Sequence, residues 1–133
     1  MNGSVLLYVL VALVAIYYLR RLLITRSIRT YSPAEVDSKL RETHGILLLD
    51  VRTEKEWNHG HLKGAVHIPL HELGRRFEEL DRHKNKEIMC YCQTGNRSLT
   101  AALRLKRLGF TVAHMKGGIA EWNFQNFRSE RSS

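Results

Sequence analysis

Hydrophobic residues fill the N-terminal part of the chain and then recur in short blocks between polar segments. Residues 5–19 are an unbroken apolar run, and Leu22–Ile24 continue it past Arg20 and Arg21. A helix over residues 5–24 would be about 30 Å long, which matches the hydrocarbon core of a bilayer. Arginines near a helix end can extend their charged groups to the lipid headgroups. The pattern therefore predicts an N-terminal transmembrane helix over residues 1–24.

A signal peptide that is removed after export is the alternative to this anchor. Signal peptides carry positive charge before the apolar run and a small-residue cleavage site after it. Here no basic side chain precedes the run and no such cleavage site follows it, whereas four arginines come after it: Arg20, Arg21, Arg26 and Arg29. Because positive charge favours the cytoplasmic side, we expect a single-pass protein with its N-terminus outside and its folded domain in the cytoplasm.

Beyond a basic connector at residues 25–31, strand-like blocks alternate with helical segments through residues 32–127. The block at residues 46–51 is apolar without alternation, which is typical of a parallel strand covered on both faces. Further strands are expected at residues 65–68, 87–91 and 111–113, and helices at residues 33–44, 53–60, 70–80, 99–108 and 119–127. This alternation predicts an α/β domain with a mostly parallel sheet and right-handed crossovers, followed by a polar, frayed tail at residues 128–133.

Length and charge restrict the class of protein further. The chain has 133 residues, which is room for one ordinary domain, and a net charge of +8. The four arginines lie before the first acidic residue, Glu35; without them, 17 basic residues face 13 acidic ones. That balance is ordinary for a protein surface, and no aromatic-plus-basic motif accompanies it. We therefore expect no nucleic-acid partner.

Cys92 and the residues that follow it form the candidate reactive site. The cysteine stands between the strand at residues 87–91 and a helical segment that begins at Leu99. A strand-to-helix turn presents unpaired backbone N–H groups and the positive end of a helix dipole, and both favour a thiolate. We expect the loop to hold an anionic sulfur and an anionic substrate through Gln93, Thr94, Gly95, Asn96, Arg97 and Ser98. The competing interpretation is that Cys92 is a small buried hydrophobic residue.

The second cysteine, Cys90, lies within the predicted strand. It could act as a resolving thiol, but a buried strand residue is the expected interpretation. Cys90 and Cys92 are too close in sequence for ordinary disulfide geometry, and two unpaired cysteines indicate a reducing compartment. His59 and His61 lie near each other, yet no set of residues has a zinc-ligand spacing, so we expect no metal and no other cofactor.

Several stretches resemble those of a single rhodanese-homology domain, a sulfurtransferase fold shared with certain cell-cycle phosphatases. They run in the family's order across roughly residues 30–127 and comprise Asp50-Val51-Arg52, Glu56, Gly60-His61-Leu62-Lys63-Gly64-Ala65, His67-Ile68-Pro69, Cys92–Ser98, Gly109-Phe110, Gly117-Gly118 and Trp122. The resemblance implies a rhodanese-like three-layer α/β domain with a mainly parallel five-stranded sheet. It also implies that the loop after the central strand is the active site.

In that family the loop cysteine is catalytic, and Cys92 occupies its position. The resemblance implies that Cys92 takes sulfane sulfur from thiosulfate or a persulfide donor. A thiol or cyanide acceptor would then remove the sulfur from a Cys92 persulfide. Asp50 and Arg52 are candidate supporting residues that would orient the loop, and a structural ion pair beside it is the competing interpretation for them.

Two other functions stay open. Related phosphatases and arsenate reductases carry a cysteine and an arginine separated by five residues, whereas four residues separate Cys92 from Arg97. The shorter loop makes a tighter ring of N–H donors, which suits one sulfur atom better than a phosphate group. The other function is a non-catalytic interaction module, although inactive relatives usually lack the cysteine. The expected partners of the anchor are the lipid bilayer and an unidentified membrane protein.

Overall fold

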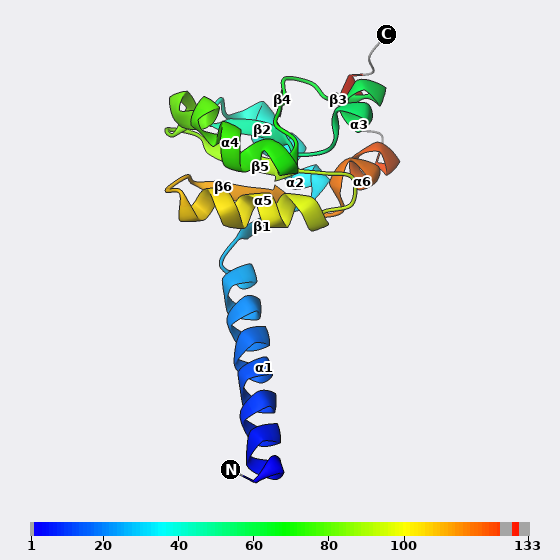
Figure 1. Ribbon diagram of the computed structural model, residues 1–133. Coiled ribbons are helices and arrows are strands. Elements are labelled where there is room, and N and C mark those ends of the chain that lie inside the picture. The colour runs from blue at the N-terminus through cyan, green and yellow to red at the C-terminus, as the bar shows by residue number, and fades with distance from the viewer. Residues whose placement is uncertain (1, 126–128, 131–133) are drawn as a thin grey trace.

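The computed structural model describes residues 2–125 and 129–130 (Figure 1). The elements of the chain, in order, are α1 (Gly3–Arg26), β1 (Arg29–Tyr31), α2 (Pro33–Glu42), β2 (Ile46–Asp50), α3 (Glu54–His59), β3 (His61–Leu62), β4 (Val66–His67), η1 (Leu70–Glu72), α4 (Leu73–Arg76), η2 (Phe77–His83), β5 (Glu87–Tyr91), α5 (Asn96–Arg107), β6 (Val112–Met115), α6 (Gly118–Phe124) and β7 (Ser129–Glu130). Two of these elements, η1 and η2, are 3-10 helices.

Five strands form the main sheet in the order β1-β6-β5-β2-β4. Each neighbouring pair in this sheet is parallel, so every connection between neighbours must cross over a face of the sheet. The central strand β5 pairs with β2 along its full length, from Ile46 opposite Glu87 to Asp50 opposite Tyr91. The predicted α/β class with a mainly parallel five-stranded sheet is confirmed. Asp50 therefore lies beside the strand residue that immediately precedes Cys92.

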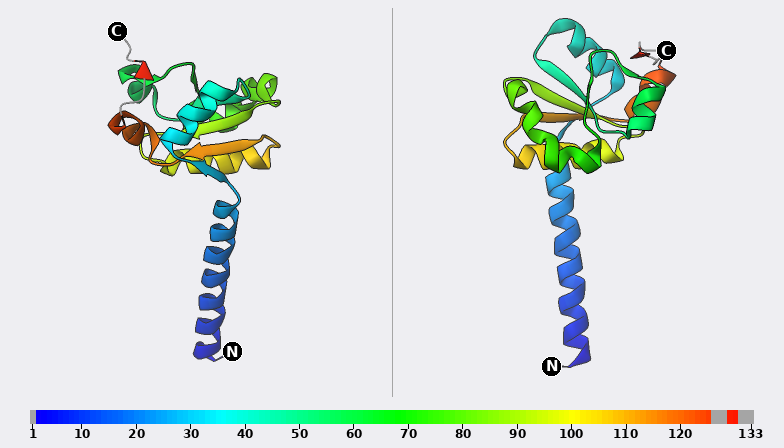
Figure 2. Two further views of the ribbon diagram at one scale, coloured as in Figure 1. Left: turned by 180° about the vertical axis from the view of Figure 1, so that it is seen from behind. Right: turned by 45° about the horizontal axis from the view of Figure 1, so that its top comes forward.

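Helices cover both faces of the sheet (Figure 2). Leu105 of α5 clusters with Ile88 of β5 on one face. Val36 of α2 and Trp122 of α6 cluster with Met89 on the other face. Successive strand residues point to opposite faces, so a strand buried on both sides must be apolar at every position. This explains why the central strands appear in the sequence as continuous apolar blocks rather than as an alternating pattern.

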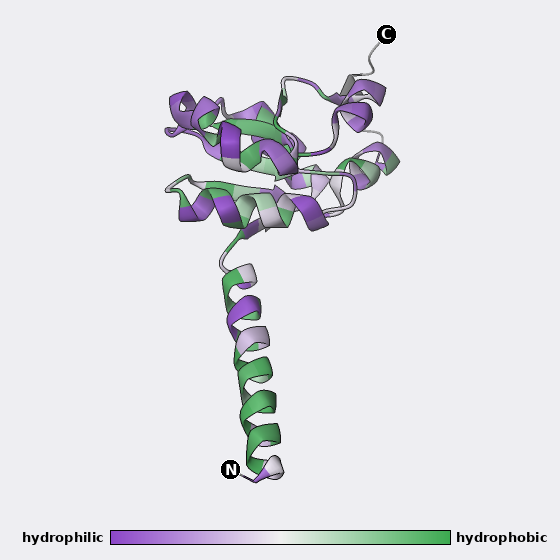
Figure 3. Cartoon of the chain, viewed as in Figure 1, coloured by the Kyte–Doolittle hydropathy of each residue, from purple (hydrophilic) through white to green (hydrophobic). Residues whose placement is uncertain are grey.

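Helix α1 projects away from the domain and buries none of its residues against it (Figure 1). It has 24 residues and is about 36 Å long at 1.5 Å per residue. It is apolar along most of its length, with one polar turn in the half nearer to the domain and an apolar turn after it (Figure 3). By length and composition it is apolar enough to cross a membrane.

The segment expected to be a connector, residues 25–31, takes part in the fold. Arg29–Tyr31 form the edge strand β1, which pairs in parallel with β6. Ile28, just before this strand, is buried in the core. Lys106 of α5 also donates a hydrogen bond from Nζ to the carbonyl oxygen of Ser27, at 3.1 Å. The end of α1 is therefore tied directly to the domain.

Two other expectations need correction. Residues 70–80 were predicted as one helix, but the structure divides this region among η1, α4 and η2. Leu73 of α4 and Leu80 of η2 are both buried, so the apolar positions of this region still face the core. Within the polar tail, Ser129–Glu130 pair in antiparallel fashion with His61–Leu62, so this part of the tail is not frayed. The other tail residues lie outside the described ranges.

Candidate active site

Cys92 lies directly after β5, where the chain turns into α5. Gly95 precedes the first residue of α5 and has a φ of +114°, a left-handed conformation that favours glycine. The turn brings the backbone N–H of Gly95 to 3.0 Å from Cys92 Sγ. The predicted loop residues are therefore divided between two parts: Gln93 to Gly95 form the turn, and Asn96 to Ser98 form the first turn of α5.

Hydrogen bonds to Cys92 Sγ determine the acidity of this thiol. Burial raises the pKa of Cys92, but a hydrogen bond with the Ser98 side chain and hydrogen bonds from the backbone N–H groups of Ser98, Gly95 and Thr94 lower it more. The resulting pKa of Cys92 lies below the ordinary value for cysteine. Donors that point at a sulfur stabilise its anion, so the loop favours a thiolate.

Cys90 has the opposite environment. It is fully buried in the core cluster that includes α5. Burial, together with the charge of Cys92, raises the pKa of Cys90 far above its usual range. A thiol in this state is a poor nucleophile, so the structure agrees with the interpretation of Cys90 as a core residue.

Ser98 connects the loop to His114, a residue that the sequence did not identify as part of the site. Ser98 Oγ lies 3.5 Å from Cys92 Sγ, 2.9 Å from the Gly95 carbonyl oxygen and 3.2 Å from His114 Nδ1. His114 lies on β6 beside β5, and burial lowers its pKa, so its imidazole is neutral at neutral pH. The only signal in the sequence was a polar residue between apolar strand neighbours.

Arg97 forms a bidentate ion pair with Glu56. Its Nη1 and Nη2 atoms donate to the two carboxylate oxygens of Glu56, each at 2.8 Å. This pairing raises the pKa of Arg97 and lowers that of Glu56. The ion pair joins the start of α5 to α3, so Arg97 shapes the loop. Glu56 was known from the sequence only as part of the family pattern.

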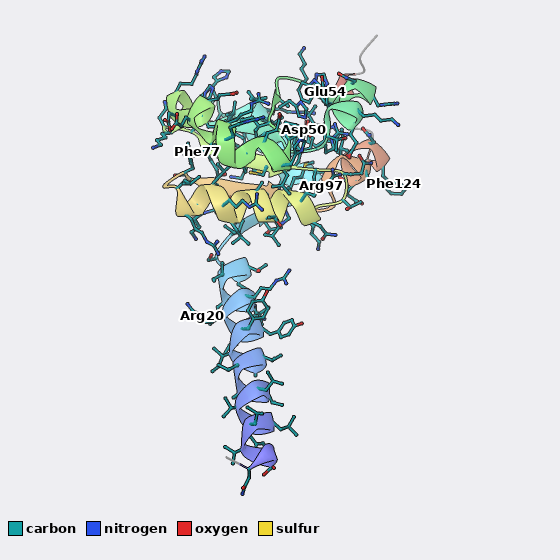
Figure 4. All side chains as sticks on the ribbon, viewed as in Figure 1. Arg20, Asp50, Glu54, Phe77, Arg97 and Phe124 are labelled. Atoms are coloured by element: carbon teal, nitrogen blue, oxygen red, sulfur yellow. The ribbon has the colours of Figure 1, made fainter. Side chains whose placement is uncertain are left out.

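Asp50 and Arg52 form a buried ion pair at the same end of the sheet, where Figure 4 labels Asp50 and Arg97. The Arg52 guanidinium reaches Asp50 at 2.7 Å, and Arg52 also donates to the Gly60 carbonyl oxygen at 2.7 Å. A longer bond of 3.4 Å runs to the Gln93 side chain. Burial opposes the charge of Arg52, but its bonds to Asp50 raise its pKa overall. The pair is buried and makes one direct contact with the loop, through Gln93.

The start of α6 holds the backbone of the loop. The N–H groups of Ile119 and Ala120 donate to the carbonyl oxygens of Cys92 and Gln93, at 2.9 and 3.1 Å. Gly118 approaches this backbone so closely that a Cβ atom there would lie 2.4 Å from the Cys92 carbonyl oxygen. The sequence showed Gly118 only as part of the family pattern, because this approach joins residues that are far apart in the chain.

A crevice of about 210 Å³ opens beside the loop between Arg52, Glu56, His59, Gln93 and Asn123. Cys92 itself is only 1% exposed. A reacting partner must therefore present a narrow, terminal atom to reach the sulfur. Among residues 2–125 and 129–130, no group of three or more His, Cys, Asp or Glu side chains is placed to hold a metal ion.

A family model for the rhodanese-like domain matches residues 32–125. The chain belongs to the rhodanese-like family. It is 33% identical over 94 residues to a sulfurtransferase from Allochromatium vinosum, and this match covers 66% of the chain and 86% of that protein. A rhodanese-related protein from Thermoplasma volcanium has a similar structure, with a TM-score of 0.70 at 26% identity, over 77% of this chain and 97% of that one.

Rhodanese-like domains also occur within larger proteins. The chain is 35% identical over 94 residues to a tRNA uridine(34) hydroxylase from Escherichia coli, which covers 67% of this chain but only 27% of that protein. Membership of the rhodanese-like family supports sulfur transfer as the general chemistry. The donor, the acceptor and the cellular location need separate arguments.

Proposed function

We propose that this chain is a membrane-anchored sulfurtransferase that carries sulfane sulfur as a persulfide on Cys92. The observation that supports this most strongly is the set of hydrogen bonds around Cys92 Sγ, including the Gly95 N–H at 3.0 Å. They lower the pKa of a nearly buried thiol, which is the requirement for a nucleophilic thiolate at neutral pH. Cys92 is the proposed catalytic residue, and Gln93 to Ser98 are the proposed binding residues.

The proposed reaction has two displacement steps. The Cys92 thiolate attacks the outer sulfur of thiosulfate, a new S–S bond forms, and the original S–S bond breaks as sulfite leaves with the electron pair. An acceptor thiolate or cyanide then attacks the outer sulfur of the Cys92 persulfide. The S–S bond to Cys92 breaks and its electron pair returns to the thiolate. No external oxidant or reductant is needed, and a persulfide donor reacts in the same way.

The loop N–H groups would stabilise the persulfide anion as they stabilise the thiolate. The alternative is phosphatase or arsenate reductase chemistry. It needs an arginine that can donate two parallel hydrogen bonds to a phosphate-like group. Here both Nη atoms of Arg97 already donate hydrogen bonds to Glu56. The short loop and the occupied arginine both favour sulfur as the substrate atom.

We further propose that α1 anchors the chain and leaves the rhodanese-like domain in the cytoplasm. The proposed organisation is a transmembrane helix at residues 1–24, a short junction that ends at Ser27, a domain that begins with Ile28 and β1 and continues to residue 127, and a C-terminal segment at residues 128–133. The arginines at the domain end of α1 support this orientation, since basic residues stay on the cytoplasmic side. A reducing cytoplasm would keep Cys92 available as a thiolate.

The decisive experiment measures the mass of the purified full-length protein after incubation with thiosulfate. The wild-type chain should gain about 32 Da, one sulfur atom, and cyanide should remove this mass as thiocyanate. Cys92→Ser should gain no mass and transfer no sulfur. Cys90→Ala is the matched control, because it removes the neighbouring thiol; it should still form the persulfide.

Other outcomes would contradict this proposal. Cys92-dependent hydrolysis of a phosphate ester without a persulfide would favour the phosphatase alternative. A folded chain with neither activity would favour the non-catalytic interaction module. For the location, a reporter that is active only in the cytoplasm should work when fused to the C-terminus; activity of an exported reporter at that position would reverse the proposed orientation.

A further inference from the structure

A second crevice, of about 550 Å³, lies between α1 and α5. None of the residues proposed for sulfur transfer lines it. Its volume is within the range of sites that bind small molecules. Four arginines line it: Arg20 and Arg21 from α1, and Arg104 and Arg107 from α5. The tertiary structure thus brings together two basic pairs that are far apart in the sequence.

The positive charge in this crevice has no counterpart in the described part of the chain. None of the four arginines forms an ion pair with a carboxylate there, whereas other arginines, such as Arg76 and Arg97, do so. Helix α5 contains no acidic residue. Like charges in such a cluster repel one another, so a bound anion would stabilise it. Guanidinium groups suit phosphate because they can donate two parallel hydrogen bonds to it.

Apolar side chains of α1 extend the lining of the crevice away from the domain. Ile16 and Leu13 line it about 6 and 10 Å closer to the N-terminus than Arg20, at 1.5 Å per residue. Figure 4 shows Arg20 in the half of α1 nearer to the domain. Along the axis of α1, the crevice therefore has cationic groups near the domain and apolar side chains one to two turns further toward the N-terminus. An amphiphile with an anionic head matches both sets of groups, whereas a small soluble anion matches only the first.

The direction of α5 fits the same ligand. It lies across the end of α1 in the views of Figures 1 and 2, and the Lys106 bond to Ser27 holds the two together. An apolar groove next to the crevice is lined by Phe77 and Leu108 and shares Arg104 and Arg107 with it. Leu108 is 42% exposed. If α1 crosses a bilayer, this face of α5 lies at the level of the headgroups.

We propose that the crevice binds an anionic phospholipid. Its phosphate contacts Arg20, Arg21, Arg104 and Arg107, and its acyl chains run along α1. The bound lipid docks the domain on the membrane through α5. Because α5 begins at the Cys92 loop, this docking holds the active-site loop at the membrane surface. The inference rests on the membrane location proposed above and is independent of the sulfur chemistry.

Native mass spectrometry of the full-length chain in detergent micelles tests this proposal. Dioleoylphosphatidylglycerol and dioleoylphosphatidylcholine are added in equal amounts, and the bound lipid is counted. The anionic lipid should be retained about tenfold more than the zwitterionic one. The double variant Arg104→Gln/Arg107→Gln should lose this preference. The matched control Lys63→Gln/Arg82→Gln removes the same charge from exposed positions outside the crevice and should keep it.

Equal retention of the two lipids, or equal losses in the variant and its control, would overturn the proposal. Glycerol phosphate in excess should not compete; effective competition would show that the site takes a soluble anion instead. Persulfide formation is measured on each variant. A chain that keeps its lipid preference but forms no persulfide contradicts only the sulfurtransferase proposal. A chain that forms persulfide without lipid preference contradicts only this one.

Discussion

Cys90 and Cys92 are two residues apart on the same chain segment, yet their surroundings give them opposite acidity. Cys90 lies within β5, where its neighbours are apolar, and burial raises its pKa. Cys92 comes just after the strand, where hydrogen bonds from the loop and Ser98 overcome the effect of burial. The end of the strand thus separates a thiol with a raised pKa from one with a lowered pKa, because only the loop has free backbone N–H groups that can point at the sulfur.

Ser98→Ala should raise the pKa of Cys92 by about one unit, because one hydrogen bond to the anion is lost. The thiolate is the reactive form, and reactivity falls as the pH drops through the pKa. The wild-type chain should therefore stay reactive to lower pH than the variant. The rate of iodoacetamide alkylation as a function of pH measures this midpoint.

Thr100→Ala is the control for this measurement, since its hydroxyl bonds to the Asn96 carbonyl oxygen on the same helix and lies away from the sulfur. Its midpoint should match that of the wild type. An unchanged midpoint in Ser98→Ala would mean that the backbone N–H groups alone set the pKa of Cys92.

At the scale of elements, the active-site loop depends on α6 as much as on β5 and α5. The first turn of α6 donates two hydrogen bonds to the backbone of Cys92 and Gln93. This contact is possible only because Gly118 has no side chain and a φ of +63°. On the other side, α3 holds α5 through the Glu56–Arg97 ion pair. Both contacts fix the direction of the N–H groups that face the sulfur.

Gly118→Ala should destabilise the domain by about 3 kcal/mol, because a left-handed alanine is strained and its Cβ would overlap the loop backbone. Gly74→Ala is the matched control. Gly74 lies in α4, and a Cβ there meets nothing within 4 Å, so this variant should be neutral or slightly more stable. Guanidinium denaturation followed by tryptophan fluorescence measures both. Equal stabilities for the two variants would show that α6 does not constrain the loop.

At the scale of the whole molecule, α1 and the domain are joined over a short boundary. None of the α1 residues is buried, whereas Ile28 and the strand β1 that follows it belong to the core and to the sheet. The boundary between the two parts therefore lies at Ser27, within the segment that the sequence suggested was a simple connector.

Removal of residues 1–26 should release a soluble domain whose rate of sulfur transfer from thiosulfate stays within about twofold of the full chain, because the core is intact. Removal of residues 1–31 also deletes Ile28 and β1. The loss of Ile28 alone should cost about 2 kcal/mol. Thermal unfolding and the thiosulfate assay compare the two truncations. A loss of activity in the shorter deletion would show that α1 contributes to the active site.

The sequence was sufficient for the features that depend on neighbouring residues. Apolar blocks such as residues 46–51 and 87–91 predicted buried parallel strands, and the helix predicted from residue 33 does begin there, as α2, with Ser32 as its cap. The unbroken run before Arg20 predicted a long apolar helix, because hydrophobicity over one segment is a local property. The position of Cys92 between a strand and a helix indicated where a thiolate would be favoured.

Only the tertiary structure decided which distant residues meet. Arg97 meets Glu56, Ser98 meets His114, and Gly118 meets the Cys92 backbone, although each pair is separated by at least 16 residues. The same holds for the crevice where the arginines of α1 and α5 converge. Local pattern carries no information on such contacts, because they arise from strand order and from the crossing of helices over the sheet. The sequence therefore determined most of the elements and the candidate nucleophile Cys92, and the fold determined what surrounds this cysteine and where the remaining charge is gathered.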